Sequence, residues 1–249
     1  MKRYIMTIQH AFTLTLLLPL CTDAFFGLTS WQLKVPYVPK IRTGLDMAYG
    51  DVTVKLVKPL GIILQERDDG LMGVQVKSMM EGSSAEKSGG IAPGDVLMRV
   101  NNDDTSTLDF DSVMELLVSA PEELSLLFND GLGTIDITPN LSKRLSPEDA
   151  VFTDAVVRRA VREIRRSKYG REQLGELRRV EIVLGAGVRS ATECAVRFFA
   201  IFSTDTVTTY SCNVSATGMR SDDGIEIVSL SCAKDEGWGQ TIDLITPRN

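Results

Sequence analysis

Residues 73–101 carry closely spaced turn signals that divide this part of the chain into very short elements. Alternating residues at Gly73–Val76 predict a strand, and Ser83–Ser88 predicts a short helix that the glycine pair at 89–90 ends. Pro93-Gly94-Asp95 predicts a turn, after which Val96–Val100 is typical of another strand. This order predicts a domain of short strands with little helix.

The flanking residues extend the same pattern. We expect further strands at Val52–Val57, Ile62–Gln65 and Leu124–Phe128. Asp109 or Asp111 can N-cap a second helix, whose apolar face at spacings i, i+3, i+4 and i+7 consists of Phe110, Val113, Met114 and Leu117. We predict that the first domain covers residues 49–130.

The order of these elements resembles the PDZ domain family, in which a strand and a Gly-Ser-Ala helix precede a Pro-Gly-Asp turn and a strand ending in Val-Asn. The stretch that carries the resemblance is Gly73–Asn101. It implies a partly open antiparallel β-barrel with two helices. It also implies a function, because such domains add the C-terminal peptide of another protein as a strand and hold its carboxylate with backbone N–H groups.

The resemblance implies a set of peptide-binding residues. Leu60, Gly61 and Ile62 match the carboxylate loop, and the peptide-pairing strand runs from Ile62 through Ile63 and Leu64 to Gln65. Lys58 occupies the place of a basic residue that often assists the carboxylate. The sequence departs from the family at Pro59, where Gly or Ser is usual, and proline has no N–H to donate.

The second helix is expected to determine which peptides bind. Phe110 stands where many PDZ domains have His, so we expect an apolar ligand residue two positions before the C terminus. Met114 and Leu117 would line the same groove. The last ligand residue is expected to be apolar and to pack against Leu60, Ile62 and Leu117. In the alternative interpretation Phe110, Met114 and Leu117 are ordinary core residues and the groove is vestigial.

A second domain is predicted over residues 147–249, after a linker at 131–146. Ser146 and Pro147 form a helix start, the apolar face includes Phe152, Val156 and Ile164, and Gly170 is a helix stop. Strands are then expected at 179–188, 194–203, 207–216, 225–233 and 240–245. One helix on an antiparallel sheet makes the whole chain an α+β protein.

The second domain also has a weaker resemblance, to the cystatin-like fold. Val183-Leu184-Gly185 is similar to the end of the first-hairpin motif of cystatins, and Trp238 falls near a late turn. The motif is incomplete, because Ile182 stands where its Gln is usual. The resemblance therefore implies the fold more than inhibition of cysteine proteases.

A basic cluster occupies the predicted long helix and the residues after it: Arg158, Arg159, Arg162, Arg165, Arg166, Lys168 and Arg171. Such a cluster can be a solvated helix face that complements the helix dipole. It can also be a docking surface for an acidic partner. Nucleic acid is not an expected partner, since the net charge is −6 and Tyr169 alone supplies an aromatic ring there.

The N-terminal residues predict a targeting leader. Lys2 and Arg3 precede an apolar run at 11–20, which is too short to span a bilayer and is typical of a signal peptide over residues 1–24. Residues 25–48 form a basic, transit-like segment, and the junction at Ala24-Phe25 resembles bipartite leaders of algae with secondary plastids. We expect import into the plastid by the secretory route, with secretion or an endomembrane lumen as the alternative.

The histidine and cysteine counts limit the chemistry. The only histidine, His10, lies in the predicted signal peptide, so a mature chain has no imidazole for a Ser-His or Cys-His mechanism. Three cysteines remain, Cys194, Cys212 and Cys232, as buried hydrophobes or with one disulfide. We predict no catalytic residue, metal or cofactor.

These observations predict a non-enzymatic interaction module, an adaptor or scaffold whose groove binds apolar C-termini. One alternative is a regulatory subunit that presents substrates to a separate protease. The other is a cystatin-like inhibitor of cysteine proteases.

Overall fold

The computed structural model describes residues 50–67, 70–204, 208–222, 224–234 and 241–246. The predicted signal peptide at 1–24 and transit-like segment at 25–48 lie outside the described residues, as does Trp238. Within the described ranges, no helix combines the length and the apolar character needed to cross a bilayer.

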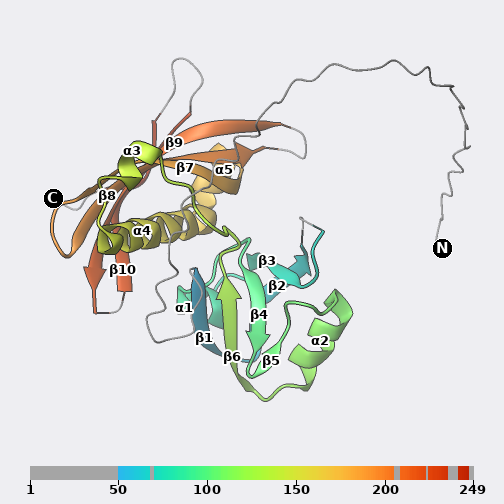
Figure 1. The fold of residues 1–249 in the computed structure, drawn as a ribbon. Coiled ribbons are helices and arrows are strands. Elements are labelled where there is room, and N and C mark those ends of the chain that lie inside the picture. Colours follow the sequence, from blue (N-terminus) through green and yellow to red (C-terminus); the bar gives the residue numbers. More distant parts are fainter. Residues whose placement is uncertain (1–49, 68–69, 205–207, 223, 235–240, 247–249) are drawn as a thin grey trace, which may run out of the picture. The chain divides into compact units, whose positions relative to one another are not determined.

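The first domain is one antiparallel sheet with two helices (Figure 1). The strand order is β1-β6-β4-β3-β2, which leaves β2 with one neighbour, and the short β5 pairs with β4. The elements are β1 (Asp51–Val57), β2 (Ile62–Glu66), β3 (Val74–Met79), α1 (Ser84–Ser88), β4 (Val96–Val100), β5 (Asp103–Asp104), α2 (Phe110–Ser119) and β6 (Glu123–Asn129). Each strand and helix predicted in this segment is present.

Local sequence signals explain where the two helices begin and end. The side chain of Ser83 accepts a hydrogen bond from the Glu86 amide at the start of α1, and Gly89 ends that helix in the left-handed conformation at φ +69°. Asp109 rather than Asp111 caps α2, by accepting from the Ser112 amide at 2.8 Å, and this bonding lowers the pKa of Asp109. Alternate strand residues such as Leu124, Leu126 and Phe128 form the core.

The second domain is a five-stranded antiparallel sheet with strand order β11-β10-β9-β8-β7 and a long helix, α4. Its elements are α3 (Pro139–Ser142), α4 (Pro147–Arg166), α5 (Lys168–Leu174), β7 (Glu176–Val188), β8 (Glu193–Ser203), β9 (Thr209–Ser221), β10 (Gly224–Lys234) and β11 (Thr241–Ile245). The predicted strands are present, with bounds that differ by one to a few residues. Each strand pairs with the strand that precedes it in the sequence, so the sheet is an antiparallel meander.

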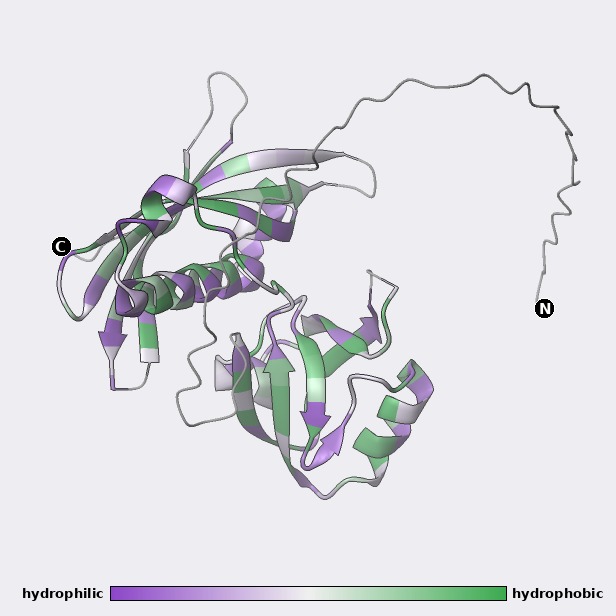
Figure 2. Ribbon diagram, in the orientation of Figure 1, coloured by the Kyte–Doolittle hydropathy of each residue, from purple (hydrophilic) through white to green (hydrophobic). Residues whose placement is uncertain are grey.

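One side of α4 builds the core of this domain with the sheet. Phe152, Val156, Val161 and Ile164 are buried among inward residues of the strands, and Figure 2 shows hydrophobic and hydrophilic positions side by side along α4. Cys194, Cys212 and Cys232 are buried in this core, and none of these three described cysteines forms a disulfide. Their burial without a disulfide agrees with the interpretation of these residues as buried hydrophobes. Burial, with a smaller effect of Cys212, also raises the pKa of Cys232 to about 12.

Gly170 does not end the long helix, so that prediction was wrong. The break comes earlier, at Ser167, which ends α4 and whose side chain accepts from the Gly170 amide to start α5. Gly170 lies within α5, where an added Cβ would come within 3.2 Å of Leu244. The glycine therefore permits close packing of α5 on β11 instead of a helix stop.

Residues 131–146, expected as a linker, pack against the second core. Leu141 of α3 is buried there, and Ile137 forms a bridge with Val183 of β7. The motif Val183–Gly185 lies inside β7 and pairs with β8, and Val183 is 1% exposed. These residues therefore lie in the first strand of the β7–β8 hairpin, and the resemblance to the cystatin-like fold stays a prediction.

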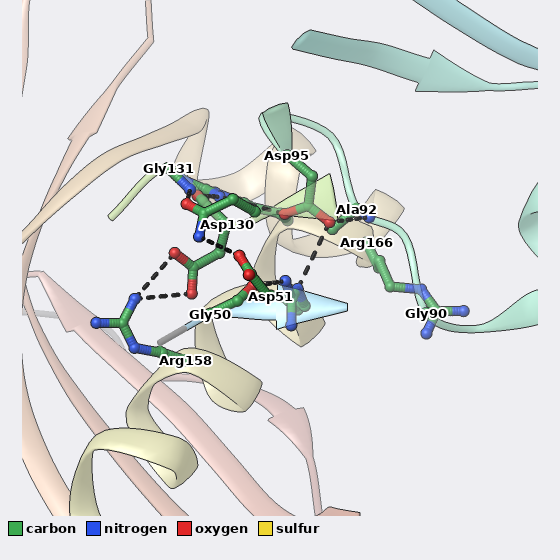
Figure 3. A network of polar contacts seen from close by, with 12 residues as sticks. Gly50, Asp51, Gly90, Ala92, Asp95, Asp130, Gly131, Arg158 and Arg166 are labelled. Atoms are coloured by element: carbon green, nitrogen blue, oxygen red, sulfur yellow. Dashed lines mark hydrogen bonds and ion pairs between the residues drawn. The ribbon is translucent and has the colours of Figure 1, made fainter. Parts of the chain in front are cut away.

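The other side of α4 faces acidic and carbonyl groups of residues 50–133 (Figure 3). Nη1 of Arg158 donates to both carboxylate oxygens of Asp130, at 2.9 and 3.0 Å, and Nη2 of Arg162 donates to the carbonyl of Gly50 at 2.5 Å. Arg165 donates to the carbonyl of Asp130 and Arg166 to that of Gly89. These four arginines are therefore engaged within the chain and do not form a solvated face.

Candidate functional site

The principal groove of the first domain runs between the open strand β2 and helix α2. It has a volume of about 860 Å³ and is walled mainly by apolar side chains. Of the residues that the sequence predicted for peptide binding, only Gly61 and Gln65 are absent from its lining, which also includes residues that were not predicted. Its lining is Lys58, Pro59, Leu60, Ile62, Ile63, Leu64, Leu97, Phe110, Met114, Leu117, Val118, Glu122, Leu126 and Phe128.

The loop at the head of the groove leaves backbone donors without acceptors. Its carbonyls are used, since Leu60 O accepts from the Ala85 amide at 3.1 Å and Gly61 O accepts from the Met80 amide at 2.8 Å. Among the described residues, the amides of Leu60 and Gly61 donate no hydrogen bond. Backbone donors that have no internal partner and lie beside an apolar groove are suited to bind a carboxylate.

Gly61 holds the loop against the start of α1. Its φ is +70°, and a Cβ added there would lie 2.2 Å from the Cβ of Ser83, the residue that caps α1. A side chain at this position would therefore require both a rare backbone conformation and displacement of Ser83. The glycine that the sequence analysis singled out is required by this close approach.

Lys58 lies in the groove wall, but its ammonium faces helix α2. Nζ donates to the carbonyl of Val118 at 3.0 Å and to that of Ala120 at 2.6 Å, at the C-terminal end of α2. Two of the three N–H bonds of the ammonium are thereby used within the protein. The family resemblance implied a role for Lys58 at the ligand carboxylate, and no local signal in the sequence indicates this contact with the helix.

Helix α2 contributes both core and groove surface. Leu117 is 8% exposed and packs in the core, Phe110 is partly buried against that core, and Met114 is 37% exposed. Val118, which the sequence analysis did not select, is 76% exposed on the same wall. Because Ile63 is also 45% exposed, the rim presents an apolar surface to solvent from both β2 and α2.

The described residues contain no group of three or more His, Cys, Asp or Glu side chains placed to hold a metal ion. The strongest perturbation of a carboxylate lies away from the groove, at Asp95 in the turn before β4. Burial raises the pKa of Asp95 to about 6, although Arg162 and Arg165 act in the opposite direction.

Comparison with known proteins identifies the first domain. Residues 51–128 match the family model of the PDZ domain, which confirms the predicted fold of this part of the chain. The chain is 43% identical over 54 residues to "Putative protein FRMPD2-like" of Homo sapiens, a stretch that is 22% of this chain and 17% of that relative. The same figures hold for "FERM and PDZ domain-containing protein 2" of Mus musculus, except that the stretch is 4% of its length.

Solved structures of PDZ domains each match about a third of the chain. The PDZ domain of choanoflagellate GIPC is 22% identical and covers 34% of this chain and 96% of its own, with a TM-score of 0.31. That domain bound to a B1AR peptide is 21% identical and covers 34% of this chain and 94% of its own, with a TM-score of 0.31.

Proposed function

We propose that this chain captures the free C-termini of other proteins as a non-enzymatic adaptor. The PDZ domain is a protein-interaction module, and the observation that carries the proposal is the apolar groove of about 860 Å³ beside the open strand β2. A peptide adding to β2 satisfies the unpaired edge of that strand with main-chain hydrogen bonds. Its terminal carboxylate then accepts from the free amides of Leu60 and Gly61.

The chemistry of the groove wall supports an apolar ligand. The peptide's last side chain would pack against Leu60, Ile62 and Leu117. Nearer the start of α2, Phe110 carries no hydrogen-bonding group and Met114 only a weak thioether acceptor, so neither side chain favours a Ser or Thr hydroxyl. We therefore expect apolar residues at the C terminus and two positions before it, because a polar group there would lose water without gaining a partner.

We further propose that this adaptor works in the plastid, which it reaches through the secretory route. The supporting observation is the apolar run at 11–20 followed by a basic segment from Phe25. Microscopy of the full chain carrying a fluorescent tag tests the location. Accumulation outside the plastid would contradict this part of the proposal.

Calorimetry with the full chain and a set of C-terminal peptides tests the binding function. A peptide with an apolar last residue should bind, and its C-terminally amidated form should bind at least about tenfold more weakly, since charge-assisted hydrogen bonds are lost. Equal affinity of the two forms would contradict carboxylate recognition.

A pair of glycine variants tests the position of the site. Gly61→Glu should abolish binding, because the new side chain collides with Ser83 and fills the carboxylate loop. Gly70→Glu is the matched control, since Gly70 has a similar φ of +73° but open space around it, and its affinity should be unchanged. Unchanged binding by Gly61→Glu would show that the loop has been misplaced.

A further inference from the structure

A second cleft, of about 510 Å³, borders the same peptide-pairing strand on its other face. Val74 and Val76 of β3 are buried in the core, so the alternation of side chains directs Gln75 and Lys77 to the opposite side of the sheet. Gln65 of β2 pairs directly with Gln75 and lines this cleft with it. The other walls are Pro93–Gly94, Val96 and Asp130–Gly131 and, in the second domain, the end of α4, α5 and the start of β7.

The cleft has an excess of positive charge. Five cationic side chains line it, against two carboxylates: Arg67, Lys77, Arg165, Arg171 and Arg178 against Asp130 and Glu176. Both carboxylates are already paired, Asp130 with Arg158 at 2.9 Å and Glu176 with Arg178 at 3.3 Å. In the described ranges, neither Lys77 nor Arg171 has an ion pair, so these two cations remain available to an anion.

A peptide strand on β2 would present its side chains to both faces of the sheet. Residues that alternate with those in the groove point to the side of Gln65, Gln75 and Lys77. The peptide runs antiparallel to β2, with its C terminus at Leu60–Ile62. The peptide residue level with Gln65 therefore lies about three positions before the terminus, and the next residue on the same side lies about five positions before it.

We propose that this cleft binds acidic side chains of the peptide whose C terminus occupies the groove. Lys77 of the PDZ domain and Arg171 of the second domain select Asp or Glu at those upstream positions. The cationic lining of the cleft favours acidic side chains. They would belong to the same peptide that fills the groove, because both the groove and the cleft include residues of strand β2. The proposal rests on the proposed function and assigns the second domain a part in peptide specificity.

Two peptides that differ only in upstream charge test the proposal on the full chain. Both end in the same apolar residue, and one carries Glu where the other carries Gln at the two upstream positions. The Glu peptide should bind about fivefold more tightly, as expected for partly exposed ion pairs. Lys77→Gln and Arg171→Gln should each reduce this preference, and the double variant should abolish it while keeping the affinity for the Gln peptide.

Two variants with the same charge change serve as controls. Lys55→Gln on β1 and Lys143→Gln after α3 are exposed and lie outside the cleft lining, so they should keep the full preference. Equal binding of the Glu and Gln peptides would overturn this inference and leave the groove function intact. An undiminished preference in Arg171→Gln would overturn the role of the second domain, whereas failure of both peptides to bind would reject the proposed function itself.

Discussion

Asp95 is a fully buried carboxylate whose surroundings only partly replace water. Its Oδ2 accepts from the Ala92 amide at 2.9 Å and lies 3.5 Å from Nε of Arg162, while its Oδ1 lies 3.9 Å from Nη1 of Arg165. In the described part of the chain Oδ1 accepts no hydrogen bond. The cost of burying the charge therefore exceeds the attraction of the arginines, and the pKa of Asp95 rises to about 6.

The raised pKa predicts a stability that increases on mild acidification. Because the pKa rises from 3.8 to about 6 on folding, the folded state binds a proton that the unfolded chain does not bind between about pH 6 and 4. At neutral pH the raised pKa lowers the free energy of unfolding by about 3 kcal/mol relative to a carboxyl that keeps its unfolded pKa, and this loss disappears as the pH falls through that window.

Denaturant unfolding of the wild type and Asp95→Asn from about pH 7 to 4 measures this effect. As the pH falls, the free energy of unfolding of the wild type should rise relative to that of the variant. Asp104→Asn is the control of opposite sign, since hydrogen bonds from Ser106 lower the pKa of that exposed carboxyl. A pH-independent difference between wild type and Asp95→Asn would contradict the role of burial.

At the scale of elements, the groove depends on how α2 is held relative to β2. Val113 and Leu117 anchor one face of α2 in the core, and Lys58 binds the carbonyls at its C-terminal end. A cation at that end also interacts favourably with the helix dipole. The residue that the family resemblance assigned to the ligand thus stabilises the groove wall.

Lys58→Met should lower the free energy of unfolding by about 1–2 kcal/mol, because two charge-assisted hydrogen bonds to α2 are lost at a partly exposed site. Lys55→Met on the neighbouring strand is the control and should change it by less than about 0.5 kcal/mol. Both values come from denaturant unfolding. If Lys58→Met left stability unchanged and weakened only peptides with a free carboxylate, the ammonium would act on the ligand, as the sequence analysis expected.

At the scale of the whole described chain, α4 is buried on two sides. Its apolar face packs on the sheet of the second domain. On the other side, Arg158, Arg162 and Arg165 are less than 10% exposed and donate to groups of Gly50 and Asp130, at the two ends of the first domain. Acidic groups of the same chain, Asp95 and Asp130, thus already pair with part of this basic cluster. A separate acidic partner stays a prediction for the remaining cations, Lys168 and Arg171 among them.

Adjacent arginines of α4 provide a matched test of this arrangement. Arg158→Ala should lower the free energy of unfolding by about 3–5 kcal/mol, because it leaves the buried carboxylate of Asp130 without its partner. Arg159→Ala, which removes a partly exposed pair with Glu163 on the same helix, should cost less than about 1 kcal/mol. If both variants lost a similar free energy of unfolding, the buried pair of Arg158 with Asp130 would contribute no more than the partly exposed pair of Arg159 with Glu163.

Much of the fold and of the groove could be predicted from short-range patterns. The caps at Ser83, Asp109 and Ser146 and the strand alternation act over a few residues, so they are legible without knowledge of the rest. The helix break at Ser167 could not be predicted, because a serine can either continue a helix or cap the next one. The close approach of Leu244 to Gly170 is a contact between distant parts of the chain, which local patterns do not reveal.

By itself, the sequence determined the PDZ domain, the helix-on-sheet second domain and the groove between β2 and α2, because periodicity, turns and caps are local. Only the tertiary structure decided what the charged groups do. Arg158 meets Asp130 across 28 positions of the chain, Lys58 meets Ala120 across 62, and Arg162 meets Gly50 across 112. Long-range folding brings such partners together, and their attraction offsets part of the cost of removing each charge from water.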